Sequence, residues 1–369
     1  MSTAFIAREI FTGHEIVTGK AVLVQNGKVV DVVDKNLIPA DYRVKDLNAY
    51  MLAPSLIDLQ IYGGNGKLFS TELTTESLEA TYEYCMHGGC SQFVITMATN
   101  SIEKFLTGIE VVKQYWSAGG KGLLGLHLEG PYINPIKKGA HVEKYIKKPT
   151  LDEVNLLIQK GKGIIKMITL APEQCDKNVI DLLLENDIVV SAGHSNATYD
   201  EAINSFYAGI PAATHLFNAM SPLQGREPGM VGAIYDHDEL MSSIVCDGVH
   251  VDFASVRISK KIMEERLFFI TDAVVEVLHG DYVHVFKEDR YTLPNGTLSG
   301  SALTMLKAVK NGVEKVGITL PEALRMASLY PAKLMGLENK YGNIKKGTTA
   351  DFIVLDDQLK LQQIIIEGE

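Results

Sequence analysis

Apolar and β-branched runs recur along the chain, and each is followed by a loop and then by a segment with helical spacing. Eight such runs span residues 52–61, 92–98, 122–128, 164–170, 187–192, 212–216, 241–246 and 266–271. The helical stretches between them include residues 73–87, 102–117, 151–160 and 253–265. This alternation is typical of βα units that build a parallel sheet.

The strand runs carry apolar residues almost without interruption, which is expected when both faces of a sheet are buried. Eight parallel strands are the number that closes a barrel. We therefore predict an α/β fold with a (β/α)₈ TIM barrel. An open doubly wound sheet is the alternative. It is disfavoured because no glycine-rich phosphate loop follows the first run and because polar residues end several runs instead of meeting at one switch point.

The two ends of the chain do not fit the barrel pattern. Residues 4–51 read as a β meander with turns at Thr12-Gly13, Thr18-Gly19 and Asn26-Gly27, and the tail also reads as short antiparallel strands. Neither end is long enough to make a robust domain alone, so we expect them to pair. The prediction is a small β-sandwich domain from residues 1–51 and 345–369, with the catalytic barrel spanning 52–344.

Composition narrows the class of protein. The 369 residues carry a net charge of −10, which argues against nucleic acid or an anionic membrane as partner, since both require a basic face. The first twenty residues lack the apolar core of a secretory signal, and no run reaches the roughly 18 apolar residues of a membrane span. The four cysteines show no CxxC spacing. A cytoplasmic protein is expected.

Polar residues end most of the apolar runs. In a TIM barrel the reactive groups lie at the C-terminal ends of the strands. The residues at those ends are Gln60, Glu129, His194, His215, Asp247 with His250, and Asp272. Of these, Glu129, His194 and His215 can offer oxygen and nitrogen ligands to one divalent metal and leave a position open for water. The set therefore predicts metal-dependent hydrolysis.

Asp272 ends the last strand in the sequence FFITDA and is the predicted base. A bound metal can lower the pKa of its water to about 7. Asp272 is placed to take the proton from that water and pass it to a leaving amine, a role worth roughly 10²- to 10⁴-fold in rate.

Other residues are candidates for substrate contacts. Arg226 is suited to clamp a phosphate by paired hydrogen bonds, although an ordinary surface arginine fits the sequence equally well. His250 either helps to bind that phosphate or caps the next helix. His141 either donates to a substrate carbonyl oxygen or lies in a solvated loop. Asn218 and Ala219 follow His215 so closely that their backbone must border the metal site.

The segment 275–294 is long for a loop after a barrel strand, and it carries aromatic and charged residues. A hairpin lid over the site is the structure we expect for it. The segment Ser299-Gly300-Ser301, just beyond, is expected to cap a helix and also to touch the substrate.

Several motifs now identify a family. The segments HLEGPYINP, SAGHSNA, THLFNAM, REPGMVG, VCDGVHV, ITDA, GTLSGSALTM and LYPAKLMGL resemble those of the N-acetylglucosamine-6-phosphate deacetylases, which belong to the amidohydrolase superfamily. The similarity spans nearly the whole chain. It includes the opening APSLIDLQIYGGNG and the tail GNIKKGTTADFIVLD.

This resemblance implies hydrolysis of the acetamide of N-acetyl-D-glucosamine 6-phosphate in amino-sugar catabolism. It implies metal ligation by Glu129, His194 and His215, with Asp272 as catalytic acid and base. The implied substrate contacts are Ala140, His141, Asn218, Ala219, Arg226, Asp247, Gly248, Val249, His250, Thr297, Leu298 and Ser299. The resemblance also implies a homodimer whose phosphate site is completed across the interface.

The first strand departs from the wider superfamily, in which many members carry His-x-His where this chain has Gln60-Ile61-Tyr62. Within the deacetylases a glutamine here points to one tightly bound metal. We expect one divalent ion, with zinc preferred and other ions left open. Deacetylation of N-acetylgalactosamine 6-phosphate and a non-catalytic barrel that binds sugar phosphates are the alternative functions.

Overall fold

The computed structural model describes residues 2–369, which divide into two compact units. One unit comprises Leu59–Tyr84 and Phe93–Leu303, and the other comprises the residues up to Asp58 together with Cys85–Gln92 and Thr304–Glu369. Every residue predicted for the functional site belongs to the first unit. The domain boundaries proposed from the sequence stay a prediction.

All eight predicted runs form strands of one sheet, in the order β15-β14-β13-β12-β11-β10-β9-β6. Their bounds are β6 Leu56–Ile61, β9 Cys90–Ala98, β10 Leu123–Glu129, β11 Ile165–Leu170, β12 Val189–Ala192, β13 Ala212–Ala213, β14 Met241–Val245 and β15 Leu267–Ile270. The two end strands meet, because the Asp272 N–H donates to the Gln60 carbonyl at 2.9 Å and the Tyr62 N–H donates to the Ala273 carbonyl at 3.0 Å. The predicted barrel is therefore confirmed and is nearly closed.

Burial explains why these strands read as continuous apolar runs. All six residues of β6 and all nine of β9 are buried. One boundary was wrong: the run 52–61 was expected to be a single barrel strand, but Leu52, Ala53 and Pro54 end β5 and pair with β19, and β6 begins at Leu56. An unbroken apolar run carries no signal for where one strand stops and the next starts.

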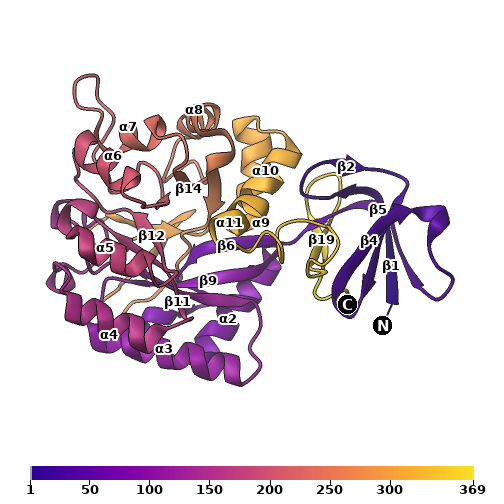
Figure 1. The fold of residues 1–369 in the computed structure, drawn as a ribbon, viewed down its shortest axis with the longest axis horizontal. Helices are drawn as coiled ribbons and strands as arrows, with labels where there is room; N and C mark the ends of the chain where they lie inside the picture. The colour runs from indigo at the N-terminus through magenta and orange to yellow at the C-terminus, as the bar shows by residue number, and fades with distance from the viewer. Residues whose placement is uncertain (1) are drawn as a thin grey trace. The chain divides into compact units, whose positions relative to one another are not determined.

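Helices follow the barrel strands, and α3 to α8 lie outside them (Figure 1). The bounds are α1 Phe69–Glu72, α2 Thr75–His87, α3 Ile102–Ser117, α4 Leu151–Gly161, α5 Lys177–Leu184, α6 Tyr199–Tyr207, α7 Gly229–Asp236, α8 Phe253–Met263, α9 Met305–Asn311, α10 Leu320–Ala327 and α11 Leu329–Leu334. Local capping sets several starts. The clearest is α6, where Thr198 and Glu201 form a reciprocal capping box. No helix within residues 2–369 combines the length and the apolar character needed to span a membrane.

The chain ends pair, as predicted, in a seven-stranded mixed sheet of order β20-β19-β5-β1-β3-β4, with β2 beside β1. The bounds are β1 Ser2–Phe11, β2 Ile16–Val17, β3 Lys20–Gln25, β4 Lys28–Asp34, β5 Arg43–Pro54, β19 Phe352–Leu355 and β20 Leu361–Ile365. The predicted turn at Asn26-Gly27 joins β3 to β4, with both residues at positive φ (51° and 74°). The purely antiparallel expectation was wrong, since β5 returns alongside β1 in parallel after the β3–β4 hairpin.

A small antiparallel sheet follows β15, formed by β16 Val285–Lys287, β17 Arg290–Thr292 and β18 Leu298–Ser301. The segment predicted as a hairpin therefore contains one. It is fastened at Tyr282, whose hydroxyl donates to the Thr99 carbonyl at 2.6 Å, and at Asp281, whose carboxylate accepts from Lys144 and Tyr145 at 2.8 Å each.

Candidate functional site

The predicted site residues lie at or just beyond the C-terminal ends of five barrel strands. Glu129 is the last residue of β10, whereas His194, His215, Asp247 and Asp272 each lie two residues beyond the end of β12, β13, β14 and β15. Three of them, His194, His215 and Asp272, have positive φ values of 48°, 37° and 53°. Left-handed backbone is costly for residues other than glycine and persists where the surrounding structure enforces it. The strand ends thus turn sharply and direct these side chains inward.

Glu129 is the centre of the cluster and is only 1% exposed. Its Oε1 lies 3.0 Å from Nε2 of His215 and 3.3 Å from Nε2 of His194, and those two nitrogens are 3.2 Å apart. A buried carboxylate oxygen and two imidazole nitrogens that face one another form a donor set suited to a divalent cation.

His141 also reaches this cluster, with Nε2 at 3.0 Å from Glu129 Oε2. Glu129, His141 and His194 place one ligand atom each within 4.8 Å of one another, and this group could hold a metal ion. Geometry alone therefore leaves two histidines, His141 and His215, competing for one place beside His194.

Hydrogen bonds at the far nitrogens separate these histidines. Nδ1 of His141 lies 3.2 Å from the Thr99 backbone N–H and 2.7 Å from the Thr99 hydroxyl oxygen. The N–H can only donate, whereas the hydroxyl can donate or accept, so both contacts are satisfied when Nδ1 accepts. This arrangement puts the ring proton on Nε2, which faces Glu129 Oε2 at 3.0 Å. His194 has the opposite arrangement, because its Nδ1 faces the Lys137 carbonyl at 2.8 Å and must donate. That leaves the Nε2 lone pair of His194 directed at the cluster, as metal-ligating histidines require.

The charges of the cluster follow from burial and proximity. Burial would raise the pKa of Glu129, but His141 and His194 outweigh it and hold that pKa well below its ordinary value. Burial and the neighbouring His194 lower the pKa of His141 to about 4. His141 is therefore a neutral donor beside an ionised carboxylate.

Asp272 is tied to Glu129 through the amide of Gln60. Gln60 Nε2 lies 2.9 Å from Asp272 Oδ1, 3.0 Å from Glu129 Oε1 and 2.9 Å from the Tyr62 hydroxyl, which itself donates to Glu129 Oε2. Burial raises the pKa of Asp272 above its ordinary value. A carboxyl group with a raised pKa is better able to hold a proton and release it again near neutral pH.

Asp247 and His250 form a pair on the loop after β14. Asp247 Oδ2 lies 2.6 Å from His250 Nδ1, and Asp247 Oδ1 accepts the backbone N–H groups of Val249 and His250 at 2.8 Å each. Burial opposes this ionisation, but the hydrogen bond from His250 keeps the pKa of Asp247 below its ordinary value. The carboxylate fixes the ring and leaves His250 Nε2 available to a ligand.

The remaining predicted contacts are distributed around the cluster. Asn218 Nδ2 lies 3.4 Å from the His215 carbonyl, and the Ala219 carbonyl accepts from the Ser195 N–H at 3.1 Å. Arg226 is exposed in the loop before α7, and within residues 2–369 its guanidinium has no hydrogen bond or ion pair. Thr297 lies in the turn before β18, where its N–H donates to Asn295.

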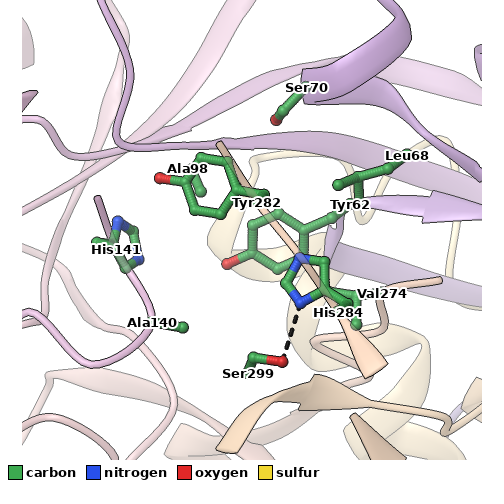
Figure 2. A pocket seen from close by; sticks show the side chains of 10 residues that line it. All are labelled: Tyr62, Leu68, Ser70, Ala98, Ala140, His141, Val274, Tyr282, His284 and Ser299. Atoms are coloured by element: carbon green, nitrogen blue, oxygen red, sulfur yellow. Dashed lines mark hydrogen bonds between the residues drawn. The ribbon is translucent and has the colours of Figure 1, made fainter. Parts of the chain in front are cut away.

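A pocket of about 40 Å³ opens beside His141 (Figure 2). Ala140 and Ser299, both predicted substrate contacts, line it, whereas Leu298 pairs with Thr292 in the hairpin sheet. Tyr282 and His284 come from the hairpin segment, and His284 Nδ1 lies 2.9 Å from Ser299 Oγ.

Sequence reasoning missed four residues of this site. Tyr62, Tyr282 and His284 line the pocket, and Thr99 fixes the ring of His141. Thr99 follows the second barrel strand directly, so the rule used for the other strand ends would have selected it. The hairpin residues carried no comparable signal, since only the tertiary fold brings them to the site.

His284 should make stability depend on pH. Burial lowers its pKa to about 4, whereas an unfolded histidine titrates near 6.5, so only the unfolded chain binds the proton between these values. Stability contributed by His284 is complete above pH 6.5 and is lost as the pH falls toward 4. Between pH 7 and pH 5 the free energy of unfolding of wild type should fall by about 2 kcal/mol more than that of His284→Gln. Denaturant unfolding of both proteins at the two pH values measures this difference.

Burial also lowers the pKa of His127 and of His141 to about 4, so the quantity to compare is the difference in pH dependence between wild type and His284→Gln. His14→Gln, at an exposed histidine, serves as the matched control. Equal pH dependence in wild type and His284→Gln would contradict the prediction.

Comparisons with known proteins agree with this geometry. Residues 51–369 match the model of the amidohydrolase family. The chain is 34% identical to the N-acetylglucosamine-6-phosphate deacetylase of Haemophilus influenzae, covering 100% of this chain and 99% of that protein.

Two solved structures are similar over the full chain. The N-acetylglucosamine-6-phosphate deacetylase of Pasteurella multocida has a TM-score of 0.96 at 34% identity, with 100% of this chain and 99% of that chain covered. A mutant of the Mycobacterium smegmatis N-acetyl-D-glucosamine-6-phosphate deacetylase, solved with N-acetyl-D-glucosamine-6-phosphate, has a TM-score of 0.93 at 28% identity, covering 100% and 98% of the two chains.

Proposed function

The chain belongs to the amidohydrolase family, and we propose that it hydrolyses the acetamide of N-acetyl-D-glucosamine 6-phosphate to D-glucosamine 6-phosphate and acetate. The observation that carries the proposal is the convergence of Glu129, His194 and His215 beside Asp272 at the strand ends. Full-length similarity to deacetylases, one of them solved with this sugar phosphate, supports the substrate.

Glu129, His194 and His215 are the residues that we assign to one divalent metal, with zinc preferred. The assignment rests on the proton positions, because His194 directs a free Nε2 at Glu129 whereas His141 Nε2 carries the ring proton. His215 completes the set, because its Nε2 lies 3.0 Å from Glu129 Oε1 and 3.2 Å from Nε2 of His194. When bound, the metal would polarise the substrate carbonyl and make water a stronger nucleophile.

The side chains divide the remaining chemistry. His141 donates a hydrogen bond from Nε2–H to the carbonyl oxygen of the acetamide and so stabilises the negative charge that develops there. Asp272 accepts a proton from the attacking water and later gives it to the nitrogen of the leaving amine. Gln60 holds Oδ1 of Asp272 in place, since its amide lies 2.9 Å away.

Arg226 and His250 are the groups that we assign to the phosphate. Both lie on neighbouring loops, after β13 and β14 respectively. A guanidinium without an internal partner suits a bidentate phosphate contact, and Asp247 orients His250. We also expect the chain to act as a homodimer.

Arg226→Ala should raise KM for the phosphorylated sugar by about 10- to 100-fold, the worth of a charge-assisted hydrogen bond. Its kcat/KM for free N-acetylglucosamine should stay that of wild type, because that sugar has no phosphate to lose. Steady-state kinetics with both sugars measure this. The control is Arg43→Ala, an exposed arginine of the small sheet. An equal loss with both sugars would show that Arg226 does not bind phosphate.

The decisive experiment is acetate release from N-acetylglucosamine 6-phosphate by the purified protein, before and after treatment with a chelator, with metal content measured on the same sample. We expect release that the chelator abolishes and added zinc restores. Faster release from the galactosamine isomer would move the substrate assignment to that sugar. A protein that purifies without stoichiometric metal and releases no acetate would be a binding barrel.

A further inference from the structure

We propose that the pocket beside His141 receives the acyl group of the substrate and that it is shaped for a 2-hydroxyacyl group, up to the size of lactoyl, in addition to acetyl. This inference rests on the proposed deacetylase function. It concerns the N-acyl group, which leaves as the free acid. The names of the relatives specify only an acetyl group at this position.

Barrel topology places the pocket opposite the phosphate candidates. The pocket is lined from the ends of β6, β9 and β10 and from the hairpin after β15, through residues such as Tyr62, Ala98, His141 and Val274. Arg226 and His250 follow β13 and β14, which lie across the ring from β9 and β10 in the order β6-β9-β10-β11-β12-β13-β14-β15. A substrate that spans the mouth would have its phosphate at β13–β14 and its acyl group on the side of β9 and β10, where Glu129 ends β10.

The chemistry of the walls agrees with an acyl group. The residues that line the pocket include no Asp, Glu, Lys or Arg, so the phosphate has no counter-charge there. Leu68, Ala98 and Val274 belong to one buried apolar cluster with the rings of Tyr62 and Tyr282. Such walls favour methyl and methylene groups over a sugar ring, which carries a hydroxyl on most of its carbons.

The pocket is larger than acetyl requires. A cavity needs about 10–15 Å³ to hold one water-sized group. A pocket of about 40 Å³ therefore holds roughly three such groups. Beyond its carbonyl carbon, acetyl offers a single methyl group, whereas lactoyl offers a carbon that carries one methyl and one hydroxyl. The acetyl methyl would leave part of the pocket unfilled.

A hydroxyl on the acyl group would meet an unsatisfied partner. Ser70 is 4% exposed, lines the pocket, and its Oγ has no hydrogen-bond partner within residues 2–369 (Figure 2). A buried hydroxyl without a partner costs free energy, and a ligand that supplies one recovers it. Neutral His284, held by Ser299, offers a second polar group on the wall without introducing charge.

The test compares kcat/KM for glucosamine 6-phosphate carrying N-acetyl, N-propionyl, N-glycolyl and N-lactoyl groups, with the common product glucosamine 6-phosphate measured. We expect glycolyl and lactoyl to be hydrolysed within about tenfold of acetyl, and glycolyl to exceed propionyl, which has the same length without the hydroxyl. Ser70→Ala should lower the glycolyl-to-propionyl ratio by about 3- to 10-fold, the worth of one neutral hydrogen bond.

Ala98→Val narrows the pocket from another wall and provides a check that does not depend on Ser70. It should reduce lactoyl turnover at least tenfold more than acetyl turnover, since one methylene in an apolar pocket is worth about 10- to 200-fold. Turnover of acetyl with propionyl, glycolyl and lactoyl all more than about 100-fold slower would overturn the inference and leave the deacetylase function standing. Failure of the metal-loaded protein to hydrolyse even acetyl would remove both.

Discussion

Asp272→Asn should lower kcat by about 10²- to 10⁴-fold, which is the usual contribution of a positioned acid-base group. The metal content of the variant should equal that of wild type. Asparagine keeps the size of the side chain and tolerates the positive φ of 53° at this position. Its amide can neither take a proton from water nor give one to the leaving amine. Acetate release and metal analysis on one preparation measure both quantities.

Substrate binding by Asp272→Asn is a second quantity to measure. The variant should still bind N-acetylglucosamine 6-phosphate, measured by calorimetry, because the residues that we assign to the phosphate, Arg226 and His250, lie on the loops after β13 and β14. Asp357→Asn makes the same chemical change at an exposed carboxylate and should be indistinguishable from wild type. Wild-type turnover by Asp272→Asn would disprove its assignment as acid and base.

Glu129→Gln should lose the metal. The carboxylate faces Nε2 of both His194 and His215, and an amide in its place brings no charge and presents N–H groups on one side. Changes to residues that merely support a ligand cost about 10- to 100-fold in metal affinity, so loss of a ligand should exceed 100-fold. Competition with a chelating indicator measures the affinity, and acetate release should fall in step.

The control for Glu129→Gln is Glu110→Gln, an exposed glutamate of α3 paired with Lys113. His215→Asn and His141→Asn then test the assignment between the two histidines. We expect metal loss from the first and a lower kcat with retained metal from the second. The reverse pattern would make His141 the ligand and His215 the donor, in conflict with the proton positions that Thr99 imposes.

Sequence periodicity was sufficient to predict the barrel, because strands that are buried on both faces consist of nearly continuous apolar residues, as in β6 and β9. The rule that reactive groups follow barrel strands selected Glu129, His194, His215 and Asp272, and the fold brings these four side chains together. These features depend on residues close together in the chain. Strand ends converge whenever the barrel forms, so no long-range contact had to be known in advance.

Features set by contacts between distant segments could not be predicted. The parallel pairing of β1 with β5 depends on how the intervening hairpin folds back. The link from Gln60 to Asp272 joins residues 212 positions apart, and the contact between Tyr282 and Thr99 joins residues 183 apart. The local sequence pattern predicts neither contact. The proton position on His141 also depends on a long-range contact, the one with Thr99.

The left-handed backbone at His194, His215 and Asp272 sets stability and activity against each other in this protein. Each such residue costs on the order of 1–3 kcal/mol, which the rest of the fold must outweigh. Glycine would relieve that cost at any of the three positions, but it would also remove a side chain that we assign to the metal or to proton transfer. Selection for thermostability alone would therefore favour inactive proteins at these positions, so a search for hardier variants must screen for turnover at every round.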